Sequence, residues 1–127
     1  MRQPAEEATL ARDSWGLLRE ALSHLALLAR DQMEWLGSVM RPDELALDFD
    51  NAYQASWQSR EAGWITDELS GYLNEIVCLI ADLTEEGPEP WSAEGLHGHL
   101  TWERLRILAR SALVLMPPTP WTSSADD

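Results

Sequence analysis

The sequence contains no lysine, so its nine strongly basic residues are all arginines. Against them stand 22 acidic residues, which give a formal net charge of −13 at pH 7 and a pI of about 4.4. This charge repels a phosphate backbone, because nucleic-acid-binding proteins place basic side chains along the phosphates. An anionic membrane surface repels it for the same reason. The composition therefore predicts no direct contact with nucleic acid or membrane, and it favours a basic protein as partner.

Cysteine is nearly absent as well. Cys78 is the only one, which excludes a disulfide within the chain. Its neighbours at positions 76, 77, 79 and 80 are all apolar, so we predict that Cys78 is a small buried residue. No apolar run approaches the ~20 residues of a membrane span. The first residues, MRQPAEEA, are acidic where a secretory leader needs basic and then apolar residues. We expect a soluble, cytoplasmic protein.

The segment Thr66–Leu83 carries the clearest structural pattern. Apolar residues recur there at alternating steps of four and three, which is the spacing of a helix that packs against other helices. These residues are Ile65, Leu69, Tyr72, Ile76, Leu79 and Leu83. Thr66 is placed to cap the start of the helix. We interpret this segment as the central helix of a bundle.

Prolines and glycines mark the limits of the other helices. A residue before proline avoids the α region, and glycine commonly follows a helix end. These signals predict four main helices, over residues 5–39, 42–63, 66–83 and 92–116. Gly16 and Gly37 leave the continuity of the first helix open. The last helix is capped by Ser92 or begins again at Thr101.

The predicted fold is a single all-α domain. Its 127 residues, 45% of them hydrophobic, suffice for one packed core. We predict a bundle over residues 1–116 with about four helices in up-down-up-down order. Residues 117–127 are predicted to form an extended, proline-rich acidic tail.

Four residues resemble a metal-binding pattern: Glu94, His97, His99 and Glu103. Glu94 and His97 have the spacing found in di-iron bundles, but those sites need a second such pair, which is missing. Side chains two residues apart on a helix point to nearly opposite sides, so His97 and His99 do not reach one ion there. No nucleophile elbow or glycine-rich phosphate loop is present. We therefore predict no metal, no cofactor and no catalytic residue.

The best candidates for a functional surface are acids without basic neighbours. No arginine lies between Arg41 and Arg60, and none lies between Glu61 and Glu103. Tryptophan anchors many interfaces, and Trp91 and Trp121 lie outside the predicted helices, whereas Trp64 lies beside an apolar stripe. The predicted partner-binding residues are Asp43, Glu44, Asp48, Asp50, Glu85, Glu86, Glu89, Trp91 and Trp121. The alternative for Trp91 and Trp121 is that they fold back over the bundle, and we favour it. Core positions are predicted for Trp15, Trp35, Trp64 and Trp102.

Charge also predicts how the last two helices pair. If they are antiparallel neighbours, Glu75 lies opposite Arg104 or Arg106, and Glu68 lies opposite Arg110. Exposed ion pairs of this kind contribute less than about 1 kcal/mol each. We expect them to set the register of the helices more than their stability.

These features favour a small non-enzymatic binding protein that occupies a basic surface of another protein. Immunity proteins, antitoxins and inhibitors have this profile, and the partner would be a toxin or a nucleic-acid-processing enzyme. One alternative is a structural subunit or homo-oligomeric component of a larger helical assembly. Another is a small metal-dependent enzyme that uses the Glu94, His97, His99 and Glu103 cluster. The arginine-only basic residues hint at a bacterial source.

Duplex DNA is expected not to bind at about 150 mM salt, because the net charge of −13 repels phosphates. Fluorescence anisotropy of a labelled duplex measures this. A sequence-specific complex that persists at this salt would contradict the prediction. It would mean that Arg104, Arg106 and Arg110 form a local basic patch that outweighs the net charge.

Overall fold

The fold is all-α in a computed structural model that describes residues 4–38 and 40–122. About 78% of the described residues are helical, and none of them forms a strand. The helices are α1 (Pro4–Ala26), α2 (Ala29–Leu36), α3 (Asp43–Ala55), α4 (Trp57–Glu61), α5 (Asp67–Glu85), the 3₁₀ helix η1 (Glu89–Trp91), α6 (Ala93–Gly98) and α7 (Leu100–Val114). The predicted fold class is confirmed. No described helix is both long enough and apolar enough to cross a membrane.

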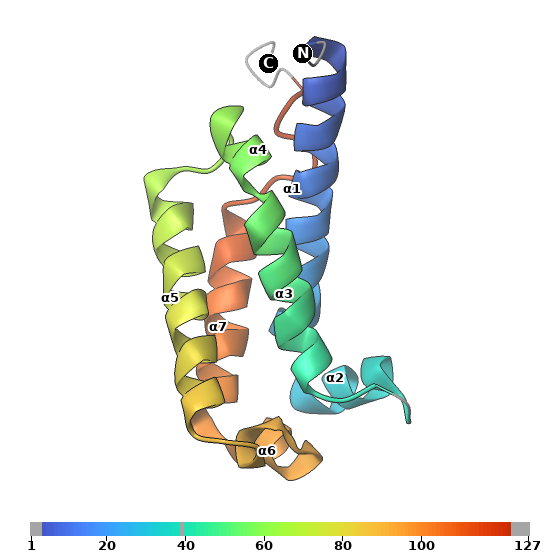
Figure 1. The fold of residues 1–127 in the computed structure, drawn as a ribbon, viewed down its shortest axis with the longest axis vertical. Helices are drawn as coiled ribbons and strands as arrows, with labels where there is room; N and C mark the ends of the chain where they lie inside the picture. Colours follow the sequence, from blue (N-terminus) through green and yellow to red (C-terminus); the bar gives the residue numbers. More distant parts are fainter. Residues whose placement is uncertain (1–3, 39, 123–127) are drawn as a thin grey trace.

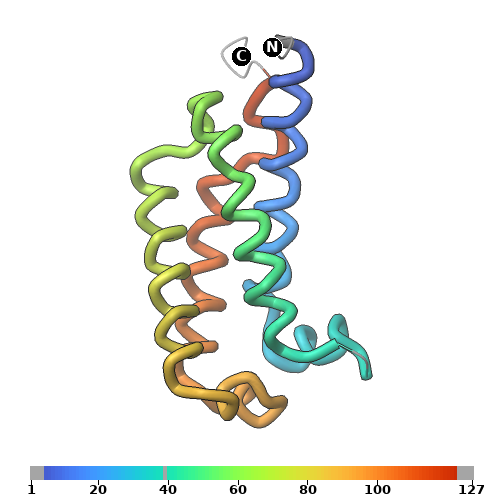
Figure 2. Tube along the Cα trace, viewed as in Figure 1, coloured from blue at the N-terminus to red at the C-terminus, as the bar shows by residue number. Residues whose placement is uncertain are grey.

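The long helices α1, α3, α5 and α7 lie side by side along the long axis (Figure 1). The short helices α2, α4 and α6 lie at the two ends, where the backbone passes from one long helix to the next (Figure 2). Helix α1 packs against α3, α4 and α7, whereas α5 packs mainly against α7. The prediction that the Thr66–Leu83 helix is central is therefore wrong. Helix α1 makes the most extensive contacts with other helices, and α5 lies at one side of the molecule, with α7 between the two (Figure 1).

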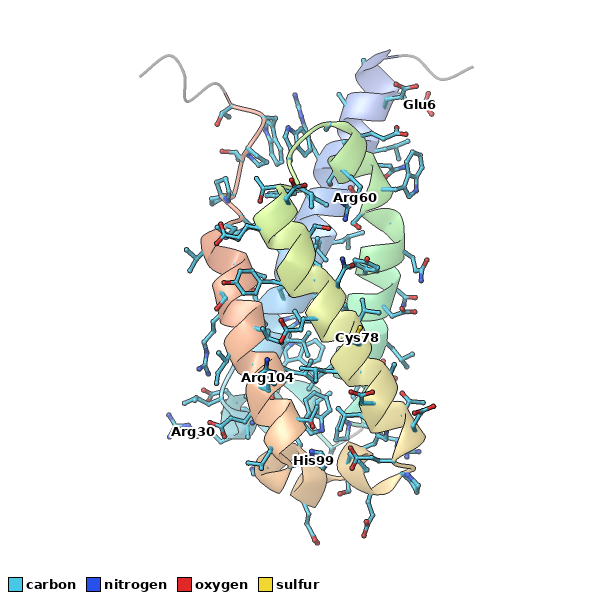
Figure 3. All side chains as sticks on the ribbon, turned by 90° about the vertical axis from the view of Figure 1, so that its left-hand side faces the viewer. Glu6, Arg30, Arg60, Cys78, His99 and Arg104 are labelled. Carbon is cyan, nitrogen blue, oxygen red and sulfur yellow. The ribbon has the colours of Figure 1, made fainter. Side chains whose placement is uncertain are left out.

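The position of α5 corrects the prediction for Cys78, which is exposed (Figure 3). Helix α5 has its main neighbour on one side only, so it buries a narrow stripe that includes Leu73 and Ile76. Cys78 lies two residues after Ile76, and two helical steps place it on nearly the opposite face. Val77, next to it, is also exposed. The apolar residues around Cys78 predicted burial, but burial also depends on how many helices pack against α5, which the local sequence does not show.

The predicted first helix is two helices. Helix α1 continues through Gly16 but ends at Ala26, and the extended backbone of Leu28 precedes α2. Gly37 then ends α2 with a φ of 67°, a conformation that glycine adopts without strain. The first helix therefore ends 13 residues before the end predicted at residue 39.

A buried glutamine explains the early break. Gln32 on α2 is completely buried, and its Nε2 donates to the carbonyl oxygens of His24 and Leu25 at 3.2 and 3.0 Å. Carbonyl groups in the last turn of a helix lack partners within that helix. Gln32 supplies partners for two of them. Arg110 on α7 supplies another, because its Nε donates to the oxygen of Ala26 at 2.9 Å.

Arg106 on α7 completes this buried network. Its Nε donates to Oε1 of Gln32 at 2.9 Å, and its Nη2 donates to the carbonyl oxygen of Leu96 on α6. The side chain is only 6% exposed. Burial lowers the pKa of the guanidinium, since desolvation disfavours its charged form. Arg106 thus joins α2, α6 and α7 through hydrogen bonds that stabilise its charge.

The predicted charge pairing is confirmed in part. Nη2 of Arg104 lies 2.6 Å from Oε2 of Glu75, which sets the register of α7 against α5. Arg110 binds the end of α1 instead of Glu68, and no ion pair within residues 4–38 and 40–122 joins these two side chains. The break in α1 brings unpaired carbonyl groups close to α7. The sequence did not reveal this competing acceptor.

Several predicted helix ends are confirmed. The side chain of Thr66 accepts from the backbone nitrogen of Leu69 at 3.1 Å, so Thr66 caps α5. Ser92 caps α6 by accepting from Gly95 at 3.0 Å. Gly63 follows α4 with a φ of 85°. These helix ends could be predicted from the sequence because each involves only neighbouring residues.

Trp15 and Trp102 are fully buried, as predicted. Trp35 and Trp64 are half-buried and pack against the core from its edge.

Replacing Arg106 by alanine is expected to lower the free energy of unfolding by about 2–4 kcal/mol, because it leaves buried oxygens unpaired. Arg104→Ala is the matched control on the same helix. It removes an ion pair whose arginine side chain is 62% exposed, so the loss should be below about 1 kcal/mol. Urea unfolding measures both variants. Equal losses would contradict the role assigned to the buried network.

Cys78 is expected to react with Ellman's reagent in the folded protein almost as fast as a free thiol in an unfolded peptide. Cys78→Ser should change the free energy of unfolding by less than about 0.5 kcal/mol, since it alters only an exposed site. Spectrophotometry gives the rate of reaction. A thiol that reacts only after urea is added would mean that α5 is rotated relative to this description.

Candidate functional site

A cavity of about 460 Å³ lies between α3 and α5. We call it the α3–α5 groove. Its lining residues come from both helices and from the segments beside them: Arg41, Asp43, Ala46, Leu47, Phe49, Asp50, Val77, Ile80, Thr84, Pro88 and Trp91. Because α3 packs against α1 and α5 packs against α7, the space beside residues 43–50 and 77–84 is left open. Beyond it the two helices meet, where Oη of Tyr53 donates to Oδ1 of Asn74 at 3.0 Å.

The surface of the groove is largely apolar. Phe49 is 1% exposed and forms part of its base. Leu47 on α3 and Val77 on α5 are 49% and 36% exposed. The lining residues lie at positions 43, 46, 47, 49 and 50 on α3 and at 77, 80 and 84 on α5, so each helix presents one stripe to the groove. Exposed apolar side chains around a concave surface are typical of a binding site.

Two carboxylates from α3 line the same groove. Asp43 and Asp50 are seven residues apart and therefore share one side of the helix. Oδ1 of Asp43 is buried and has no hydrogen-bond partner in the described part of the chain. A buried oxygen without a donor is unfavourable. Asp43 and Asp50 together make this wall of the groove negatively charged.

The structure separates the predicted acids of α3. Asp43 and Asp50 lie in the groove, while Asp48 lines a different cavity together with Leu17 and His24 of α1. Glu44 is half-buried and is not part of the groove lining. Asp48 and Asp50 point to nearly opposite sides because they are two residues apart on one helix.

The predicted acids of the loop are all exposed. Glu85 ends α5, Glu86 follows it, and Glu89 begins η1. Between them, Pro88 lines one end of the α3–α5 groove. Oε1 of Glu86 lies 2.8 Å from Nε2 of His99. The acidic loop therefore adjoins the groove without filling it.

Trp91 and Trp121 both pack back on the bundle, which confirms the favoured prediction. The ring of Trp91 meets that of Trp102 edge to face, 5.6 Å between centroids, and it lines the α3–α5 groove. The ring of Trp121 lies 5.4 Å from that of Trp64, with the guanidinium of Arg12 above it. Of these two tryptophans, Trp91 is the one that lines the same groove as Asp43 and Asp50 of α3.

The described part of the predicted tail, residues 117–122, lies against α1. The carbonyl oxygen of Pro117 accepts from Nε1 of Trp15 at 2.8 Å. The backbone then turns, with Thr122 donating to Thr119 at 3.1 Å. Residues 123–127 of the predicted tail lie outside the described residues.

The metal-like cluster is not assembled. Both ring nitrogens of His99 are engaged, since Nδ1 accepts from the backbone of Thr101 and Nε2 pairs with Glu86. His97 is exposed, as are Glu94 and Glu103. Within the described ranges, no three His, Cys, Asp or Glu side chains are placed to hold a metal ion. His99 instead caps the start of α7.

The apolar part of the groove was missed from the sequence. Val77 lies among apolar residues that indicate burial, and Leu47 lies among acids, so neither is predicted to line a binding surface. A usable signal was present, because Leu47 lies off the face formed by Leu45 and Phe49. Such an off-face leucine in an acidic helix indicates either a second neighbour or an exposed contact residue.

No protein-family model, curated protein or solved structure matches the chain, so the following proposal rests on the residues of the groove.

Proposed function

We propose that the protein is a small, non-enzymatic binding protein that occupies a basic surface of a partner protein. One observation carries the proposal: Asp43, Asp50 and Trp91 share the lining of the apolar α3–α5 groove. An apolar centre with an aromatic residue and charges at its rim is the usual composition of a protein interface. The net charge of −13 would speed the encounter with a basic partner.

The class of partner follows from the same chemistry. Enzymes and toxins that act on nucleic acids carry basic surfaces for phosphate contacts. An acidic protein bound over such a surface blocks it, which is the action of an immunity protein, antitoxin or inhibitor. This role needs a stable scaffold and no cofactor. A cytoplasmic bacterial protein fits it.

The scaffold in this proposal is a four-helix, up-down-up-down bundle. The lengths of α1, α3, α5 and α7 support it, as do the short helices between them. In this interpretation α2, α4 and α6 belong to the connections. The open side between α3 and α5 is then the functional face of the bundle.

The second candidate is a structural subunit or homo-oligomer. Leu100, Ile107 and Val114 on α7 favour it, because they are seven residues apart and 83%, 52% and 83% exposed. This spacing places them on one line along the helix, as in a helix–helix contact. Repulsion between copies of net charge −13 opposes self-association at low salt. Light scattering after size exclusion distinguishes a monomer from an oligomer.

Asp50→Asn combined with Glu89→Gln is expected to weaken partner capture severalfold, mainly through a slower association rate. Both side chains are exposed, so the melting temperature should stay within about 2 °C. Asp48 is left unchanged because it lies away from the groove. Surface plasmon resonance with the protein recovered by pull-down from the native host measures the rates at several salt concentrations.

The control is Asp13→Asn combined with Glu61→Gln, which removes the same charge from exposed positions on α1 and α4. If both double variants bind at the same reduced rate, only net charge matters. Capture that is insensitive to salt and to both variants contradicts the proposed acidic contact. Recovery of no basic protein by the pull-down contradicts the function itself.

A further inference from the structure

The walls of the α3–α5 groove limit what can bind in it. Both walls are helices, whose backbone groups are already paired within each helix. The described residues contain no strand whose edge could pair with an extended peptide. A bound segment must therefore satisfy its backbone hydrogen bonds by itself or with water. A helix does so within itself, whereas an extended peptide would depend on water along the whole groove.

The length of the groove matches a short amphipathic helix. Its lining runs from Asp43 to Asp50 on α3 and from Val77 to Thr84 on α5. Seven helical steps cover about 10 Å, which is two turns. Two turns present apolar side chains at positions i, i+4 and i+7 to one groove, the known pattern of helix-in-groove binding. Leu47, Val77 and Ile80 are the apolar surface that such side chains would cover.

The charges of the groove select a basic occupant. The buried Oδ1 of Asp43 lacks a donor, and Asp50 lies two turns further along the same wall. Arg41 is the one basic residue of the lining. Glu85 and Glu89 add exposed negative charge beside the groove. A second copy of this chain is a poor occupant, because each copy carries a net charge of −13.

We propose that the α3–α5 groove binds an amphipathic helix of the partner protein, with its apolar stripe against Leu47, Val77 and Ile80 and an arginine or lysine against Asp43. The identity of the occupant as a basic partner rests on the proposed function. The groove itself rests on its own geometry.

Designed peptides test this directly. The probe is a fluorescein-labelled, N-acetylated 18-residue peptide of leucine, alanine and arginine, with leucine at i, i+3, i+4 and i+7 spacing. One control peptide has the same composition with its leucines distributed around the helix. A second control has glutamate in place of arginine. Fluorescence anisotropy at about 150 mM salt should show saturable binding of the first peptide, at least about tenfold tighter than either control.

Protein variants then locate the peptide. Leu47→Gln with Val77→Gln should weaken binding by about tenfold or more, since both side chains lose their apolar contact. Ile107→Gln with Val114→Gln is the matched control at exposed apolar positions of α7, and it should bind as the parent does. Asp43→Asn should lower the affinity for the arginine peptide severalfold. It should not lower the affinity for the glutamate peptide, which is already weak. Circular dichroism and melting curves confirm that each variant is folded.

The outcomes separate the groove from the function. Equal binding by the groove variant and the α7 variant overturns the groove proposal, as does equal binding of the arginine and glutamate peptides. If a basic partner is captured from the host and the groove variant captures it equally well, the function stands and the groove fails. If the groove variant loses the peptide and no partner is captured, the groove stands and the proposed function fails.

Discussion

The hydrogen bonds of Arg106 and Gln32 hold together the end of the molecule at which the chain reverses direction through α2 and again through α6. Gln32 pairs with the last carbonyl groups of α1, and Arg106 joins Gln32 to Leu96 on α6. Two buried side chains thereby connect α1, α2, α6 and α7. Removing one partner from a buried charged network costs more than the pair contributes by itself, because the other is left unsatisfied. The arrangement of the connections depends on this network.

The groove follows from the same constraint. Since α1 ends at Ala26, α2 and the segment after it carry the chain to the start of α3 near one end of the molecule (Figure 1). Helix α3 then packs along α1, while α7 packs between α1 and α5. Helices α3 and α5 each have their main contacts elsewhere, so the space between them stays open beside residues 43–50 and 77–84, next to the hydrogen bond between Tyr53 and Asn74. The apolar residues of the groove are thus a result of helix placement and not of a local motif.

The limits of prediction from the sequence follow from the range of each interaction. Thr66 and Ser92 were recognised as caps because their partners are three residues away. The break after Ala26 depends on Gln32 meeting Arg106, 74 positions later in the chain. No local pattern reports such a contact. The prediction that Cys78 is buried was wrong for a related reason, because the exposure of this residue depends on how many helices surround α5.

Asp43 differs from the acids that serve only solubility. An acid that serves solubility is exposed, as Asp67 and Glu68 are. Asp43 instead keeps one oxygen buried without a partner in the described part of the chain. Its place in the first turn of α3 contributes roughly 0.3–1 kcal/mol through the helix dipole. A buried oxygen without a donor costs about 1–3 kcal/mol. The dipole therefore does not offset the whole of this cost, and under the proposed function a basic side chain of the partner would offset the rest through the carboxylate of Asp43.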